Sequence, residues 1–193
     1  MNKDVLRKTY LWKRKTLNSH EKQKRETQMQ KHFMTLLQQL PEIKRLHVFM
    51  PISKQNEPDT LSLIRELTNQ NSNIEVVIPK TGEDGSLTHY LYSDKTKIIK
   101  NSWGIPEPEN GEIVPEESLD LVVIPMIVFD KIGNRIGYGK GFYDRFLTKC
   151  TSNCIKIGYC ITPPLDLIPF AESHDVPLDY AISPLGADHF IKL

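Results

Sequence analysis

The residues best suited to chemistry gather between Asp130 and Arg145. Four of the ten glycines of the chain lie in this stretch: Gly133, Gly137, Gly139 and Gly141. Glycines let backbone N–H groups approach a ligand closely and adopt positive φ angles. Arg135, Lys140 and Arg145 add positive charge, and Asp130 and Asp144 add hard oxygen atoms that suit Mg²⁺. Together these residues favour a phosphate-binding site.

The neighbouring segments place this glycine-rich stretch between a strand and a helix. The apolar run 121–125 predicts a buried strand, and residues 142–150 have a helix-like pattern. A helix N-terminus after such a loop favours an anion. The loop is not a P-loop, because Lys140 is followed by Gly141 and not by Ser or Thr. It also lacks the spacing of a dinucleotide fingerprint, and an ordinary strand-to-helix turn would not need four glycines.

The rest of the chain predicts alternating strands and helices. Expected helices cover 2–17 and 19–39, with Ser19 as N-cap and Pro41 as terminator, and a third begins near Asp59. Expected strands cover 46–50, 74–78, 87–92, 119–124, 155–160 and 178–183, with Pro51 and Pro79 closing the first two. This order predicts an α/β fold: a three-layer αβα architecture with a mainly parallel, Rossmann-like sheet and an N-terminal helical hairpin.

We expect one domain over residues 1–193, with a basic helical arm at 1–40 and an α/β core at 45–193. Ligands bind beyond the C-terminal ends of parallel strands, so the loops 51–58 and 126–141 should line one cleft. Residues 94–119 have no clear periodicity and are expected to be irregular.

Composition limits the classes of partner. The net charge is +1, although residues 1–31 contain ten Lys and Arg against three Asp and Glu. There is no membrane-length apolar run and no signal-peptide pattern, and the three cysteines lack zinc-site spacing. We therefore expect a cytoplasmic protein with reduced thiols, a monomer or weak homodimer, without nucleic-acid or membrane partners.

A longer pattern resembles the signature of the 5-formyltetrahydrofolate cyclo-ligase family. It consists of Val123-Ile124-Pro125, Phe129-Asp130-Lys131-x-Gly133-Asn134-Arg135-x-Gly137-x-Gly139-Lys140-Gly141-Phe142-Tyr143-Asp144, Lys3-x-x-x-Arg7, Glu57 and 102–108. The resemblance extends over nearly the whole chain. It implies an enzyme that uses ATP and Mg²⁺ to close 5-formyltetrahydrofolate into 5,10-methenyltetrahydrofolate, with release of ADP and phosphate. ATP would phosphorylate the formyl oxygen, and N10 would then attack the activated carbon.

The same resemblance implies roles for individual residues. Lys140 and Arg135 would be catalytic, and Asp144 and Asp175 would hold Mg²⁺, although Asp175 could equally be a turn residue. ATP contacts are implied for Lys3, Asp4, Val5, Leu6, Arg7, Arg135, Ile136, Gly137, Tyr138, Gly139, Lys140, Gly141, Phe142 and Tyr143. Tyr138 stands where some relatives carry Arg, which would remove one phosphate contact.

Folate binding is implied for Ile52 and Glu57, the latter accepting hydrogen bonds from the pterin. Glu57 could instead cap the following helix. Apolar or stacking walls could come from Met50, Trp103, Phe129 and Tyr143. Trp103 is equally plausible as a core residue.

Two other functions remain open at this point. One is a different ATP-dependent ligase or phosphotransferase on the same scaffold. The other is a nucleic-acid-binding module led by the basic residues 1–31, which would bind in a strongly salt-dependent way. The near-neutral net charge disfavours the second.

Overall fold

Helices come first in the chain and strands follow. The computed structural model describes residues 2–40, 42–69, 73–170, 172 and 175–190, so Pro41 lies outside the described residues. The α-helices are α1 (Lys3–Lys15), α2 (Ser19–Leu37), α3 (Thr60–Asn69) and α4 (Phe142–Leu147), with 3₁₀ turns η1 (Ser53–Gln55) and η2 (Glu116–Ser118). The strands are β1 (Arg45–His47), β2 (Glu75–Thr81), β3 (Leu87–Leu91), β4 (Ile98–Lys100), β5 (Pro106–Pro108), β6 (Leu121–Pro125), β7 (Val128–Phe129), β8 (Arg135–Ile136), β9 (Ile155–Tyr159), β10 (Tyr180–Ser183) and β11 (Gly186–His189).

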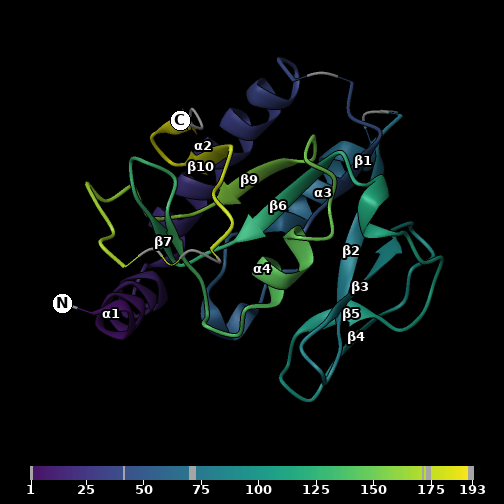
Figure 1. The fold of residues 1–193 in the computed structure, drawn as a ribbon, viewed down its shortest axis with the longest axis horizontal. Helices are drawn as coiled ribbons and strands as arrows, with labels where there is room; N and C mark the ends of the chain where they lie inside the picture. The colour runs from purple at the N-terminus through teal and green to yellow at the C-terminus, as the bar shows by residue number, and fades with distance from the viewer. Residues whose placement is uncertain (1, 41, 70–72, 171, 173–174, 191–193) are drawn as a thin grey trace.

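One seven-stranded sheet forms the centre of the molecule (Figure 1). Its strand order is β11-β10-β9-β6-β1-β2-β3. The pairs β10–β9, β9–β6, β6–β1 and β1–β2 are parallel, while β11 and β3 pair antiparallel at the two edges. The prediction of a mainly parallel sheet is confirmed. The carboxyl ends of β1 and β6, neighbours at the centre of the sheet, therefore point to the same edge.

Helices cover both faces of this sheet. Along β6, Leu121 and Val123 pack with α2 and α3, and Val122 and Ile124 pack with α4. This alternation follows from the two-residue period of a strand, because successive side chains point to opposite faces. The three-layer prediction is confirmed. Cys154 and Cys160 are free thiols packed in the layer around α4, as expected.

The first two helices bury their apolar residues in different places. Met29 and Phe33 of α2 are fully buried in the core beneath the sheet. Leu6 of α1 instead packs with Val128, Ile136 and Ile168, beside the β7–β8 hairpin (Figure 1). Helix α2 is thus a layer of the fold, and α1 lies against the glycine-rich region. The division at residues 40–45 stays a prediction.

Several boundaries differ from the prediction for local reasons. Pro79 does not end β2, which continues to Thr81. Strand β1 has already ended beside it, so the missing N–H of proline removes no ladder hydrogen bond. Asn18, not Ser19, caps α2, because its side chain accepts from the Glu21 N–H. The hairpins β4–β5 and β7–β8 and the edge strand β11 were not predicted, since each consists of very short strands.

Two buried histidines face each other beneath α4. The rings of His47 and His89 lie 5.0 Å apart, and that of Phe146 lies 5.1 and 4.1 Å from them respectively. No ring nitrogen of either histidine has a hydrogen-bond partner within the described chain. Burial lowers the pKa of both imidazoles, that of His89 to about 4. Both histidines are therefore neutral in the folded protein.

The protein should lose stability as the pH falls from about 6.5 towards about 4. In that range the unfolded chain binds protons at His47 and His89 that the folded protein does not. Each such group lowers the free energy of unfolding by at most about 1.4 kcal/mol per pH unit. Urea unfolding at a series of pH values should show a shallower decline for His89→Phe than for the unchanged protein. Exposed His20 supplies the control, and His20→Gln should keep the original slope; an equal slope for His89→Phe would contradict this account.

Candidate functional site

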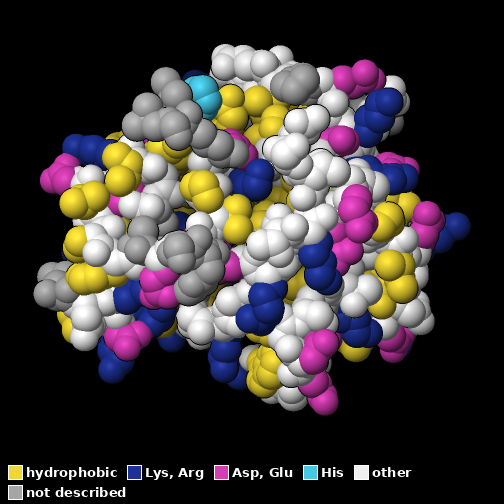
Figure 2. All heavy atoms as spheres, viewed as in Figure 1, with side chains coloured by type: hydrophobic (Ala, Val, Ile, Leu, Met, Phe, Trp, Pro, Cys, Tyr) yellow, Lys and Arg dark blue, Asp and Glu magenta, His cyan; other side chains and the backbone are white. Residues whose placement is uncertain are grey.

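A cleft of about 510 Å³ opens where β1 and β6 end. The face drawn in Figure 2 is hollowed near its centre, and hydrophobic and basic side chains meet there. The cleft is lined by Lys3, Arg7, Phe49, Met50, Ile52, Gln55, Glu57, Pro79, Thr81, Leu87, Trp103, Ile105, Pro106, Pro125, Arg135, Gly137, Tyr138, Gly139, Lys140, Gly141, Phe142, Tyr143, Asp144, Glu172 and Asp175. Both predicted loops contribute, so the prediction of a shared cleft is confirmed.

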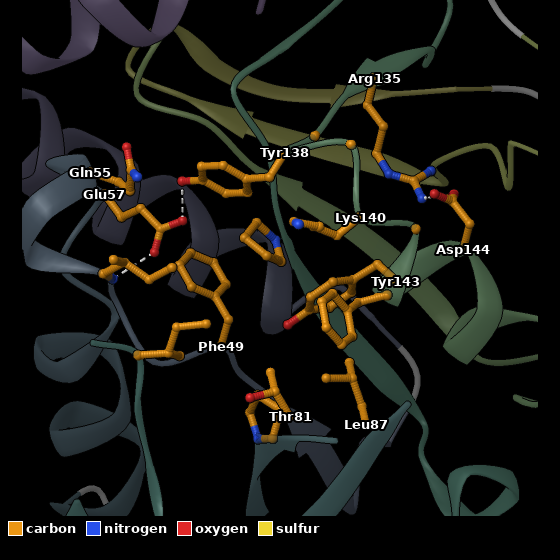
Figure 3. Close-up of a pocket in the computed structure, with 18 of the residues that line it drawn as sticks. Phe49, Gln55, Glu57, Thr81, Leu87, Arg135, Tyr138, Lys140, Tyr143 and Asp144 are labelled. Carbon is orange, nitrogen blue, oxygen red and sulfur yellow. Dashed lines mark hydrogen bonds and ion pairs between the residues drawn. The ribbon is translucent and has the colours of Figure 1, made fainter. Parts of the chain in front are cut away.

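Charged side chains form one end of the cleft. Arg135 pairs with Asp144 and donates to the Val176 carbonyl (Figure 3). Lys3 pairs with Asp175 at 3.2 Å and with Glu172 at 3.3 Å. Residues distant in sequence, from α1, β8, α4 and the segment near 175, thus meet around a mixed set of cations and carboxylates.

Lys140 differs from these paired residues. Its side chain extends towards the middle of the cleft (Figure 3). Within the described ranges it makes no hydrogen bond or ion pair from its ammonium group, and the residue is exposed. A cation without a protein partner at this position can neutralise negative charge on a ligand.

The glycine loop between β8 and α4 is held in place by α1. The Arg7 side chain donates to the Gly137 carbonyl at 2.9 Å and also pairs with Asp4. At Gly139, where φ is +84°, an added Cβ would lie 3.2 Å from the Arg7 guanidinium. Glycine is needed there both for the left-handed backbone and for this close approach.

Glu57 marks the opposite end of the cleft. Its carboxylate accepts from the Ile52 N–H at 2.6 Å and from the Tyr138 hydroxyl (Figure 3). Burial raises the pKa of Glu57, while the Tyr138 and Ile52 hydrogen bonds oppose the rise. The alternative that Glu57 caps α3 is wrong, because the Asp59 carboxylate accepts from the Leu61 N–H at 3.0 Å.

Arg14 lies buried next to this end of the cleft, where it contacts Tyr138, and it was not predicted as a site residue. It is 1% exposed and donates to Tyr138, to the Gln55 carbonyl at 2.9 Å and to the Met126 carbonyl at 3.2 Å. In sequence it is one of three consecutive basic residues in α1. Only its seven-residue spacing from Arg7 gives a signal, because two helical turns place both arginines on one face.

The wall between the two ends is apolar with a few polar atoms. Met50 and Tyr143 line it as predicted, and Phe49, Gln55 and Leu87 are additions that sequence reasoning missed. Within the described chain, the Tyr143 hydroxyl and the Gln55 Oε1 are buried without hydrogen-bond partners. Both atoms therefore have hydrogen-bonding capacity that the described chain leaves unused.

Trp103 stands at the rim of the cleft. It is 53% exposed and lies edge-on to Phe142, with ring centroids 6.3 Å apart, so the alternative of a core position is wrong. Its loop is organised by Asn101, whose Oδ1 accepts from the Trp103 and Ile105 N–H groups at 2.9 and 3.0 Å. The Asn101 amide also donates to Thr81 at 2.8 Å.

Some residues singled out by sequence lie away from the cleft. Asp4 and Val5 are exposed on α1, and Leu6 and Ile136 are buried together in one hydrophobic cluster. The ATP contacts expected for these four residues therefore stay a prediction.

Three other expectations from sequence are corrected by the contacts. Buried Asp130 accepts from the N–H groups of Asn134 and Ile168 and shapes the loop, so it is not placed to hold a metal. Arg145 donates to the Gly85 carbonyl at 2.7 Å, outside the cleft, and Phe129 is buried in the core.

Among the described residues, no group of three or more His, Cys, Asp and Glu side chains could hold a metal ion. No helix in that part of the chain combines the length and the apolar character needed to cross a membrane.

Comparison with known proteins gives one consistent family. Residues 1–184 match the model of the 5-formyltetrahydrofolate cyclo-ligase family. A 5-formyltetrahydrofolate cyclo-ligase of Mycoplasma genitalium is 30% identical over 182 residues, which cover 94% of this chain and 95% of the relative.

Solved structures agree. A 5,10-methenyltetrahydrofolate synthetase from Mycoplasma pneumoniae superposes with a TM-score of 0.74 at 27% identity, covering 94% of this chain and 98% of that one. The corresponding synthetase of Aquifex aeolicus gives a TM-score of 0.74 at 28% identity, covering 100% of this chain and 95% of that one. The fold and the family are therefore both shown.

Replacing Asn101 by Ala should destabilise the protein and loosen the Trp103 loop. The change removes the acceptor of the exposed Trp103 N–H and of the partly buried Ile105 N–H, and each lost hydrogen bond should lower the free energy of unfolding by at most about 1.5 kcal/mol. Urea unfolding measures the loss, and tryptophan fluorescence reports the loop. Exposed Asn153 provides the matched control, since Asn153→Ala should change neither. Unchanged stability and fluorescence in Asn101→Ala would contradict the role given to Asn101.

Proposed function

Because the chain belongs to the 5-formyltetrahydrofolate cyclo-ligase family, we propose that its cleft binds 5-formyltetrahydrofolate and Mg-ATP together and forms 5,10-methenyltetrahydrofolate, ADP and phosphate. The chain is an enzyme of this family. One observation carries the assignment of the substrates to the cleft. A single cavity has Glu57 at one end and Arg135 at the other, with Lys140 reaching into the space between them (Figure 3).

The Glu57 end suits the pterin ring of a folate. A carboxylate has about four lone-pair sites, and Ile52 and Tyr138 use two of them. The remaining sites can accept from the adjacent N–H donors on the edge of a pterin. Met50, Phe49 and Ile52 also line the cleft and would pack against the ring.

The basic end suits the phosphates of ATP. Four basic residues line the cleft: Lys3, Arg7, Arg135 and Lys140. Within the described chain, the Lys140 ammonium group has no ion pair that would have to break before it binds a phosphate. The glycines at 137, 139 and 141 leave the loop backbone open to the ligand, and at Gly137 nothing lies within 4 Å of an added Cβ. This loop and Lys3 to Arg7 of α1 would together surround the nucleotide.

The reaction needs the two ligands in contact. The formyl group on N5 is an amide, so its carbon is a poor electrophile and its oxygen a poor leaving group. Transfer of the γ-phosphoryl group to the formyl oxygen releases ADP, makes the carbon more electrophilic and turns the oxygen into a good leaving group. N10 of the same folate then attacks the activated carbon and loses its proton, and the C–O bond breaks to release phosphate as the methenyl bridge forms.

The protein contributes positioning and charge in this scheme. Lys140 and Arg135 would neutralise the charge that grows on the transferring phosphoryl group. No residue needs to form a covalent intermediate, because the attacking nitrogen belongs to the substrate. Trp103 and Phe142 at the rim would limit the entry of water, which would otherwise hydrolyse ATP.

Asp144 and Asp175 fit a magnesium ion that is shared with the nucleotide. Mg²⁺ in nucleotide sites is bound by one or two carboxylates together with phosphate oxygens. Both aspartates line the basic end of the cleft and now pair with Arg135 and Lys3. When bound there, the ion would supply charge neutralisation on the phosphates.

The direct experiment is a product assay. Purified protein is mixed with 5-formyltetrahydrofolate and Mg-ATP, and the near-ultraviolet absorbance of the methenyl product is followed. We expect product only when both substrates and Mg²⁺ are present. Folded protein without product would instead support a different ATP-dependent ligase on this scaffold.

Lys140→Ala should abolish most of the cyclisation and leave the fold intact. The ammonium group makes no contact in the described structure that the fold needs, yet it faces the cleft. Loss of one such electrostatic contact lowers kcat by on the order of 10²–10³. Exposed Lys95 gives the control, since Lys95→Ala should keep full activity. Full activity of Lys140→Ala would remove Lys140 from the reaction.

Asp144→Asn should raise the Mg²⁺ concentration needed for half-maximal rate by at least roughly tenfold. Even a residue that only orients a metal ligand typically costs about tenfold in metal affinity when it is replaced. The measurement is a Mg²⁺ titration at saturating ATP. Asp94→Asn, at an exposed position, should leave the titration unchanged. If Asp144→Asn also titrates like the unchanged protein, Asp144 does not hold the metal.

A further inference from the structure

Tyr138 belongs to one substrate site by sequence and to the other by contact. It lies between Gly137 and Gly139 in the loop that we assign to the nucleotide. Its hydroxyl, however, donates to Glu57 at the pterin end (Figure 3). This side chain therefore connects the two halves of the cleft.

The connection continues into α1. Arg14 donates to the Tyr138 hydroxyl, and its guanidinium lies 5.5 Å from the Tyr138 ring centroid. Arg7, two turns earlier on the same helix, donates to the carbonyl of the neighbouring Gly137. Tyr138 is thus held from one side by a buried cation and presents its proton to a buried carboxylate on the other. Any movement of the glycine loop changes this pair of contacts.

We propose that Tyr138 couples the two substrate sites, so that a nucleotide bound to the glycine loop raises the affinity of the enzyme for its folate substrate. The inference rests on the proposed function and deepens it. Glycines give the loop conformational freedom, and a nucleotide bound to the loop would favour the arrangement in which Tyr138 makes its contacts with Arg14 and Glu57. Once the loop is restricted, the Tyr138 hydroxyl holds the Glu57 carboxylate in one orientation. The pterin then binds an acceptor that is already placed, and less conformational entropy is lost on binding.

The coupling is reciprocal by thermodynamic necessity. The folate must raise the affinity for the nucleotide by the same factor as the nucleotide raises that for the folate, and such factors are typically about 5- to 150-fold. The contacts of Tyr138 make it a positioning residue, because it acts on the substrate through Glu57. Its removal should change the coupling factor and not only the separate affinities.

Calorimetric titration tests this directly. The dissociation constant of 5-formyltetrahydrofolate is measured without and with a saturating, non-hydrolysable ATP analogue and Mg²⁺. We expect a ratio of at least about fivefold for the unchanged protein and a ratio near one for Tyr138→Phe, which keeps the ring but loses the hydroxyl. Arg14→Lys, which cannot make all three hydrogen bonds of the guanidinium, should also lower the ratio.

Tyr10→Phe is the matched control. Tyr10 lies on the same helix but packs with the cluster around Leu6, and no hydrogen bond of its hydroxyl is found in the described chain. It should keep the ratio of the unchanged protein. A full ratio in folded Tyr138→Phe, or a ratio of one in the unchanged protein, overturns the coupling and leaves the proposed function standing. Failure of the unchanged protein to bind either ligand would overturn the proposed function itself.

Discussion

The hydrogen bonds between α1 and the glycine loop are the interactions on which the site depends. A loop with this many glycines has little conformational preference of its own, so its shape is set by its contacts. Arg7 holds the Gly137 carbonyl and Arg14 holds the Tyr138 hydroxyl, from one face of one helix. Because the Tyr138 hydroxyl also donates to Glu57, the contacts of α1 extend through the glycine loop to the Glu57 end of the cleft.

The charges of the cleft suit an exchange of partners. In the structure, Arg135 is paired with Asp144, and Lys3 with Asp175. If the proposed triphosphate and Mg²⁺ bind here, the phosphates would offer Arg135 and Lys3 new anionic partners, and Mg²⁺ would offer Asp144 and Asp175 a cation. Such an exchange avoids the large penalty of leaving a charge desolvated and without a partner. Lys140, which starts without a partner in the described chain, adds net attraction for a polyanion.

Sequence reasoning succeeded where the signal is local and failed where it is long-range. The continuous apolar run of β6 and the helical spacing of α2 predicted the layers, and the loops after β1 and β6 predicted the cleft. Arg14 was missed because, in sequence, only its spacing from Arg7 separates it from the basic neighbours Lys13 and Lys15. Its burial and its hydrogen bonds to the Gln55 and Met126 carbonyls appear only in the structure. Asp130 looked like a metal ligand, but its hydrogen bonds to Asn134 and Ile168 occupy it.

The central claim is that ATP and the folate react with each other inside this one cleft. The most direct test uses 5-formyltetrahydrofolate carrying oxygen-18 in its formyl group, converted by the enzyme with unlabelled Mg-ATP. If the formyl oxygen is phosphorylated and then leaves, the inorganic phosphate released must contain one labelled oxygen for each methenyl product formed. Product accompanied by unlabelled phosphate would show that the phosphoryl group never reached the formyl oxygen and would contradict the account.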